Sequence, residues 1–158
     1  MTLTDHLRRA IPPFLMVSVC ATLLACSGEA PDTHPDKVMT KRRAIFKQMT
    51  KTLEPIGLAA AGREPFRAPE VLAQAQQLEQ LSAQPWPLFT ADGNYPPTRA
   101  KPEVWSDAQG FGAAKDDYLQ KVQQLTAAAR TGDAEATKQA FDAVTVSCKA
   151  CHKKYRNE

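Results

Sequence analysis

The final turns of the chain carry the run Cys148-Lys149-Ala150-Cys151-His152, a C-x-x-C-H pattern that ends six residues before the C-terminus. On an α-helix, residues three and four positions apart lie on one face, so both thiols and the imidazole share one side of the helix. Two such thiols can add across the two vinyl groups of a porphyrin, and the adjacent imidazole can bind its iron. The run therefore predicts one covalently attached haem c, with His152 as the axial ligand.

A C-x-x-C pair has two other common uses, as a thiol redox site and as half of a structural zinc site. A redox pair is expected at a strand-to-helix turn in a βαβ unit, and the sequence has no such pattern. A zinc site needs four ligands, and the chain offers no second cysteine pair outside its leader. His6 lies in that leader and His34 in a linker. The sequence therefore favours haem attachment.

The first 26 residues resemble an export signal, with a positive start at Arg8 and Arg9 followed by an apolar stretch over residues 11–25. This stretch is shorter than the roughly 20 apolar residues that a spanning helix needs. It ends in Leu23-Leu24-Ala25-Cys26, which resembles the lipobox of bacterial lipoproteins. We therefore expect a signal peptide over 1–26 and a periplasmic protein.

In a lipobox the cysteine becomes the lipidated first residue of the mature protein, so Cys26 is the expected lipidation site and the only expected contact with a membrane. Ordinary cleavage, for example after Ala30, and an uncleaved anchor are the alternatives. With Cys20 in the leader, no cysteine pair remains for a disulfide.

After residue 26 the chain has 18 Lys and Arg against 16 Asp and Glu. Two haem propionates would bring this balance close to neutrality. A nucleic-acid binder would show a strongly basic face, so nucleic acid is not an expected partner. Residues 27–36 are polar, contain Pro31 and Pro35, and predict a linker to a domain over 37–158.

Four stretches have apolar residues at helical spacing, and no stretch alternates with the period of a strand. They cover residues 37–61, 68–83, 102–130 and 133–155. Two short connections make each consecutive pair antiparallel, and the Pro- and Gly-containing loop over 84–101 joins the pairs. The prediction is an all-α fold, an antiparallel four-helix bundle with one covalently bound haem near the C-terminus.

Three segments carry a more specific signal. Arg63-Glu64-Pro65-Phe66 follows the first predicted helix, Lys101-Pro102-Glu103-Val104-Trp105-Ser106-Asp107 opens the third, and Cys148 to Arg156 closes the fourth. In this order the segments resemble the cytochrome c′ family across about residues 37–157.

The resemblance implies further site residues. Counted back from Phe66, the family's basic residue near a haem propionate falls on Arg42, and its bulky distal residue over the iron falls on Phe46. Arg156 lies one turn after His152, where the family has Arg or Lys close to the proximal pocket. Plain core packing is the alternative for Phe46, and an exposed terminal arginine is the alternative for Arg156.

The resemblance also implies a high-spin, five-coordinate haem that binds nitric oxide and carbon monoxide, with electron transfer as a further role and a homodimer as the assembly. If Met49, or less readily Met39, ligates the iron, the alternative is a six-coordinate, low-spin electron-transfer cytochrome. A redox partner protein could be steered by Lys149, Lys153 and Lys154. We do not expect the protein to be an enzyme. Weak nitric oxide reductase or peroxidase activity ranks last among the candidate functions, because no His or carboxylate has a clear position on the distal side for acid–base work.

Overall fold

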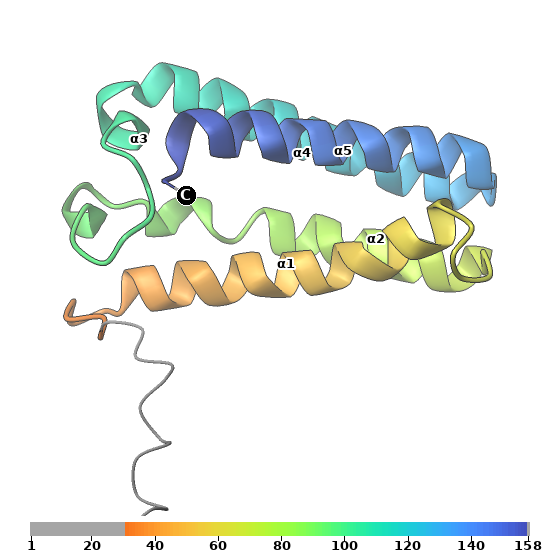
Figure 1. Cartoon of the computed structure of the whole chain (residues 1–158), viewed down its shortest axis with the longest axis horizontal. Coiled ribbons are helices and arrows are strands. Elements are labelled where there is room, and N and C mark those ends of the chain that lie inside the picture. Colours follow the sequence, from red (N-terminus) through yellow and green to blue (C-terminus); the bar gives the residue numbers. More distant parts are fainter. Residues whose placement is uncertain (1–30, 158) are drawn as a thin grey trace, which may run out of the picture. The chain divides into compact units, whose positions relative to one another are not determined.

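The computed structural model describes residues 31–157 (Figure 1). The predicted signal peptide, Cys26 and the start of the predicted linker lie outside these residues. The described part contains four long helices, one short helix and two 3-10 turns: α1 (Val38–Ala60), α2 (Ala68–Ser82), η1 (Trp86–Leu88), η2 (Ala91–Gly93), α3 (Glu103–Ser106), α4 (Ala108–Thr131) and α5 (Ala134–Tyr155).

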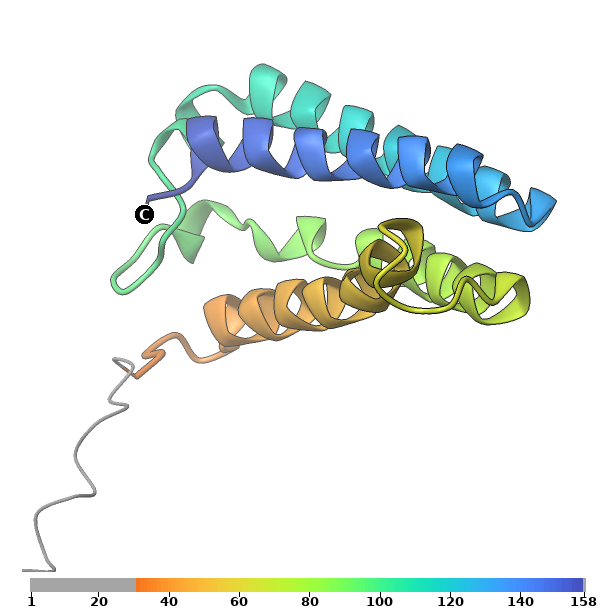
Figure 2. The same cartoon turned by 45° about the vertical axis from the view of Figure 1, so that its right-hand side comes forward.

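The four long helices form a closed bundle. Helix α1 packs against α2 and α5, and α4 packs against the same two helices. Figures 1 and 2 show the α1–α2 hairpin beside the α4–α5 hairpin, with the loop after α2 crossing from one to the other. The predicted all-α four-helix bundle is therefore confirmed. Within residues 31–157, no helix combines the length and the apolar character needed to cross a bilayer.

Local sequence signals fix most helix ends. Pro69 stands in the first turn of α2, where its missing N–H costs nothing. Helix α4 ends at Gly132, whose φ of 73° is the left-handed conformation that glycine adopts without strain. The Asp133 carboxylate then accepts from the N–H groups of Glu135 and Ala136 at the start of α5. The sharp α4–α5 turn follows from these two neighbours.

Two details of the helices do not follow from the apolar periodicity of the sequence. Pro55 lies inside α1, and the helix continues through it to Ala60. The stretch over 102–130 is divided, because α3 ends at Ser106 and Asp107 begins α4 as its N-cap, accepting from the N–H of Gly110. One periodic apolar pattern can therefore span two helices when only a single residue separates them.

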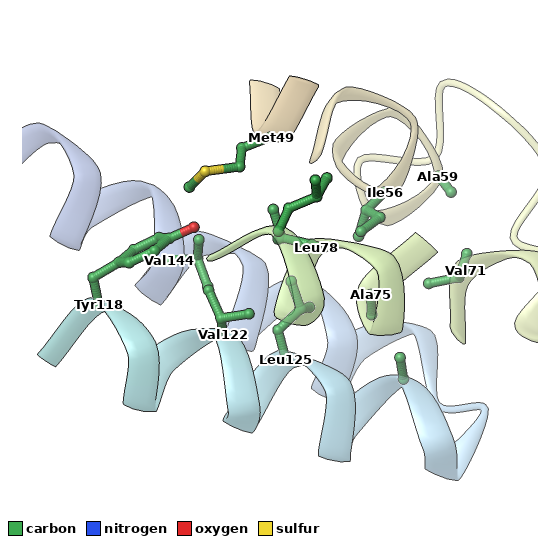
Figure 3. Close-up of a cluster of buried hydrophobic side chains, with 12 residues drawn as sticks. Met49, Ile56, Ala59, Val71, Ala75, Leu78, Tyr118, Val122, Leu125 and Val144 are labelled. Atoms are coloured by element: carbon green, nitrogen blue, oxygen red, sulfur yellow. The ribbon is translucent and has the colours of Figure 1, made fainter. Parts of the chain in front are cut away.

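The core occupies the centre of the bundle (Figure 3). Ile56, Leu78, Leu125 and Val144, one from each long helix, are each at most 1% exposed. Gly57 of α1 leaves room for the Phe141 ring of α5, because a Cβ there would lie 2.5 Å from Cζ of Phe141. This packing closes one half of the bundle and leaves a cavity toward the C-terminal end of α5.

Candidate haem site

A cavity of about 390 Å³ opens in the half of the bundle that contains the C-x-x-C-H run. Its walls come from all four long helices, from α3 with the segment before it, and from the loop after α2. The lining residues are Met39, Arg42, Arg43, Phe46, Lys47, Met49, Thr50, Leu53, Leu78, Trp86, Phe89, Thr98, Arg99, Ala100, Val104, Phe111, Tyr118, Ser147, Cys148, Cys151, His152, Tyr155 and Arg156. The helices thus bring together every site residue predicted within the folded domain.

Cys148, Cys151 and His152 lie on the cavity wall contributed by α5. Both cysteines are free and half-buried. Burial raises the pKa of the Cys148 thiol to about 11, with the charge of Cys151 acting in the same direction, and burial also raises the pKa of Cys151. A reactive redox cysteine has a lowered pKa, so this pair does not have the character of a thiol redox site.

His152 faces two arginines. Nη1 of Arg156 lies 3.5 Å from Nδ1 of His152. Partial burial lowers the pKa of His152, and the positive charges of Arg156 and Arg99 lower it further. Metal-bound histidines usually donate their second ring N–H to a carboxylate or carbonyl, which raises their basicity as ligands. A guanidinium has donors only, so Arg156 cannot play that part.

Arg42, on α1, lines the cavity and is buried, with 4% of its surface exposed. Its guanidinium donates to the carbonyl of Leu88 at 3.3 Å and to Oγ1 of Thr98 at 3.0 Å. Its Cζ lies 4.3 Å from the centre of the Phe89 ring. Burial lowers the pKa of Arg42, but these contacts keep a charged group tolerable there. Arg42 therefore fixes the loop after α2 against α1.

Phe46 lies one turn after Arg42 and belongs to a cluster of aromatic rings. Its ring meets Trp86 edge-on at 6.2 Å and Phe89 at 6.4 Å between centroids. The cluster continues through Phe111 to Tyr155. Four of these cavity-lining rings were not singled out from the sequence: Trp86, Phe89, Phe111 and Tyr118. The one available signal was the aromatic content of the loop after α2, in Trp86-Pro87-Leu88-Phe89.

The N–H and hydroxyl groups of these rings form hydrogen bonds with other protein groups. Trp86 Nε1 donates to the carbonyl of Ser82 at 2.6 Å. The Tyr118 hydroxyl pairs with the Ser82 hydroxyl at 2.9 Å, and the Tyr155 hydroxyl donates to Asp107 at 2.8 Å. We call Phe46, Trp86, Phe89, Phe111, Tyr118 and Tyr155 the aromatic cage. Its surface toward the cavity is effectively apolar.

Met49 and Met39 both line the cavity and are both buried, at 7% and 1% exposure. Met49 also belongs to the central hydrophobic cluster with Ile56 and Leu78 (Figure 3). A thioether in such a position packs well against neighbours and can also ligate iron. The position of Met49 thus keeps it as the competing sixth ligand.

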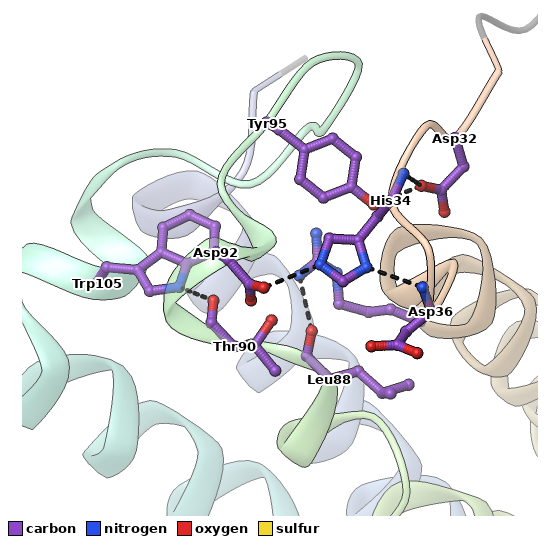
Figure 4. Close-up of polar contacts among 9 residues, drawn as sticks. Asp32, His34, Asp36, Leu88, Thr90, Asp92, Tyr95 and Trp105 are labelled. Atoms are coloured by element: carbon purple, nitrogen blue, oxygen red, sulfur yellow. Dashed lines mark hydrogen bonds and ion pairs between the residues drawn. The ribbon is translucent and has the colours of Figure 1, made fainter.

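Residues 31–36, the described part of the predicted linker, lie against the loop after α2 (Figure 4). The Asp32 carboxylate accepts from the Tyr95 hydroxyl and, at 2.7 Å, from the N–H of Thr40. Nε2 of His34 lies 2.9 Å from Oδ2 of Asp92, and its ring stacks on that of Tyr95. This segment braces the loop that carries Thr98, a partner of Arg42.

The cavity suits a haem in shape and in chemistry. Two free thiols and one imidazole share a wall, aromatic rings provide an apolar interior, and basic side chains are available for propionates. Within residues 31–157 no group of three His, Cys, Asp or Glu side chains is arranged to hold a metal ion directly. The donor set therefore fits a porphyrin-bound iron better than a zinc ion.

Comparison with known proteins leads to the same cofactor. The cytochrome c′ family model matches residues 37–156. Cytochrome c′ of Rubrivivax gelatinosus is 33% identical over 127 residues, covering 78% of this chain and 97% of the relative. A nitric-oxide-bound ferrous variant of the Alcaligenes xylosoxidans protein superposes with a TM-score of 0.75 at 30% identity, covering 80% and 98% of the two chains.

A second structure of the Alcaligenes xylosoxidans protein, a carbon-monoxide-bound variant, superposes with a TM-score of 0.76 at 30% identity and covers 81% of this chain and 100% of the other. The family match spans most of the chain, and it includes the C-x-x-C-H run on the cavity wall. The chain belongs to the cytochrome c′ family and is a haem protein of cytochrome c′ type that carries haem c.

Proposed function

We propose that the protein binds nitric oxide, and more weakly carbon monoxide, in the cavity beneath the aromatic cage, and that Cys148, Cys151 and His152 hold the haem there. When bound, the haem supplies an iron with one open coordination position. Structures of the Alcaligenes xylosoxidans relative hold nitric oxide and carbon monoxide. The observation that carries the proposal for this chain is the apolar cage around Phe46.

The cage selects ligands by polarity and by size. Bound oxygen is polar and is stabilised by a distal hydrogen-bond donor. The indole of Trp86 and the hydroxyls of Tyr118 and Tyr155 are already committed to Ser82 and Asp107. Thr50 and Ser147 donate to carbonyls of their own helices. The aromatic cage, Thr50 and Ser147 therefore have their donors engaged elsewhere, which favours neutral diatomics that need no donor over oxygen.

Phe46 controls entry to the open position. A phenyl ring has no lone pair, so it excludes water without ligating iron. Its edge-on contacts with Trp86 and Phe89 hold the ring in place, and a ligand enters only when the ring turns aside. Among the described residues that line the cavity, His152 is the one His, Asp or Glu, so nitric oxide reductase and peroxidase activity rank behind simple binding.

The surroundings of His152 also support nitric oxide binding. Arg156, the described group within hydrogen-bond distance of Nδ1, has no acceptor, so it does not provide the partner that normally strengthens a histidine ligand. His152 would therefore hold the haem iron through an imidazole that Arg156 does not strengthen. The biological role that follows is buffering of, or protection against, nitric oxide.

Titration of the haem-loaded protein with nitric oxide tests the proposal. The ferric and the ferrous protein should both show saturable absorption changes, whereas oxygen should give no stable complex with the ferrous form. Absence of a spectral change with nitric oxide would refute the proposal.

We further propose a periplasmic location, with Cys26 as a lipid anchor and residues 27–36 as the tether. The support is the lipobox-like run Leu23 to Cys26. Replacing Cys26 by serine should move the protein from the membrane fraction to the soluble periplasmic fraction, and metabolic labelling with palmitate should disappear. Retention of the label would assign the lipid to another residue.

We also propose a homodimer, by analogy with the family's usual assembly through its first two helices. In this chain these are α1 and α2, and Pro55 lies within α1. Sedimentation equilibrium of the haem-loaded protein should give twice the chain mass. A single chain mass at all concentrations would exclude the dimer.

A further inference from the structure

Among residues 31–157, the ionisable groups on the cavity wall, apart from the haem-attachment residues and tyrosines, are all cationic. In this described part of the chain no Asp or Glu lines the cavity, and five Lys and Arg side chains do: Arg42, Arg43, Lys47, Arg99 and Arg156. Two haem propionates would balance two of them. A surplus of positive charge therefore remains at the cavity even in the haem-loaded protein.

This surplus continues onto the surface around the cavity. Residues 37–53, 99–101 and 143–157 together contain twelve Lys and Arg and no Asp or Glu. The other described residues contain six Lys and Arg against fourteen Asp and Glu. The domain is therefore strongly dipolar although its net charge is small.

Helical spacing arranges these charges in two rows. On α1, Arg43, Lys47 and Lys51 follow one another at four-residue intervals, and on α5 Lys149 and Lys153 lie one turn apart. Helices α1 and α5 are neighbours in the bundle. With Arg99 and Arg156, which also face His152, the two rows form a basic rim. We define the basic rim as Arg43, Lys47, Lys51, Arg99, Lys149, Lys153 and Arg156.

Lys37 and Lys41 stand at the start of α1. Positive charge near a helix N-terminus is unfavourable because the macrodipole is positive there, and the first turn of α1 has no acidic residue. Lys154, by contrast, is bound 2.7 Å from Oδ2 of Asp107 and serves the α3–α4 junction. Lys154 is therefore not part of the rim, although the sequence placed it with Lys149 and Lys153.

We infer that the basic rim is a docking surface for an acidic electron-transfer protein, which passes one electron to the ferric haem in this cavity. This inference rests on the proposed function, because the haem must be present and its iron must change oxidation state. The partner is oxidised and the iron is reduced by one electron, and no bond forms or breaks. Complementary charge brings the partner's cofactor to the cavity mouth and accelerates encounter.

Stopped-flow reduction of the ferric, haem-loaded protein by reduced flavodoxin, an acidic protein, tests the inference. The second-order rate should fall as salt is added, because salt screens attraction between exposed charges. The double variant Lys51→Glu/Lys153→Glu should lower the rate about tenfold at low ionic strength. Neither residue lines the cavity.

Arg63→Glu combined with Arg67→Glu is the matched control. It makes the same change in net charge in the segment between α1 and α2, which lies at the other end of the bundle from the C-terminus (Figure 1). Its rate should stay within about twofold of the wild type. A rate that does not depend on salt, or an equal loss in both double variants, would overturn the docking surface.

Two further measurements separate the outcomes. Every variant is titrated with nitric oxide, and normal binding with a slowed flavodoxin reaction supports the docking surface. Failure of the wild type to bind nitric oxide overturns the proposed function, while the flavodoxin rates still test the rim. Binding of the rim to phosphatidylglycerol vesicles, lost in Lys51→Glu/Lys153→Glu without a change in the flavodoxin rate, would show a membrane surface and overturn the inference.

Discussion

The hydroxyl of Tyr155 donates to Oδ2 of Asp107 at 2.8 Å, which ties the last residue of the haem-attachment helix to the N-cap of α4. Asp107 also accepts from the N–H of Gly110 at 3.1 Å. The Lys101 N–H donates to the carbonyl of Tyr155 at 2.9 Å, which adds a main-chain link at the same point. The position of His152 therefore depends on this junction.

Gly110→Ala should disrupt the junction. A Cβ there would lie 2.3 Å from Oδ2 of Asp107 and 2.6 Å from the Tyr155 hydroxyl. Overpacking of this kind costs about 1–3 kcal/mol of unfolding free energy. Gly112→Ala is the control, because a Cβ there meets nothing within 4 Å, and alanine should stabilise the helix by about 0.5–1 kcal/mol. Urea unfolding of both haem-loaded variants measures the difference, and equal stabilities would contradict the prediction.

Asp32 should make the free energy of unfolding depend on pH in the acid range. Burial alone would raise its pKa, but hydrogen bonds from Tyr95, Thr40 and His34 outweigh this and hold the pKa of Asp32 well below its usual range. A lowered pKa in the folded state means that its stabilising effect is complete above the unfolded value near 3.9, and is lost as the pH falls toward the folded value.

Asp32→Asn tests this dependence. The Tm of the variant should be below that of the wild type at about pH 7, and the gap should close as the pH falls below about 4. Differential scanning calorimetry of both proteins over this range provides the measurement. A gap that is the same at every pH would show that the Asp32 carboxylate contributes no charge-dependent stability.

Phe46→Ala should open the distal face. In the wild type a ligand must push the Phe46 ring from its rotamer, which costs about 0.5–1.5 kcal/mol. The variant has no ring to move. Carbon monoxide should therefore associate with the ferrous protein up to about tenfold faster. Met49→Leu keeps the volume of a neighbouring wall residue and should leave this rate near that of the wild type. Flash photolysis gives both rates, and unchanged kinetics in Phe46→Ala would assign Phe46 to plain core packing.

Arg156→Gln should lower the reduction potential. A nearby positive charge disfavours the more positive ferric state, so its removal favours that state by an amount on the order of tens of millivolts. Arg130→Gln, an exposed charge in the last turn of α4, makes the same change in net charge away from the cavity lining and should shift the potential less. Spectroelectrochemical titration compares the two, and equal shifts would mean that Arg156 acts only through net charge.

The sequence predicted the parts of the site that depend on helical spacing. Cys148, Cys151 and His152 lie within one turn of each other, as do Arg42 and Phe46, and the structure places all five on the cavity wall. Their roles toward the haem remain predictions. The four-helix bundle was predictable because each long helix has its own apolar stripe and clear ends.

The rest of the site depends on contacts between distant segments. Trp86 and Phe89 enter the cage from a loop whose path is fixed by Arg42, more than 40 positions earlier, through bonds to Leu88 and Thr98. Nothing in local periodicity indicates such a path. The division at Asp107 was missed for a similar reason, because the break depends on its bonds to Tyr155 and Lys154.

The central claim is that the haem carries one axial ligand from this chain, His152, with Phe46 on the open side. The absorption spectrum of the haem-loaded protein, ferric and then reduced with dithionite, tests it most directly. The account predicts a high-spin charge-transfer band in the ferric form and a broad reduced spectrum without separate α and β bands. Sharp α and β bands on reduction, lost in Met49→Leu, would show a sixth ligand from Met49 and contradict the account.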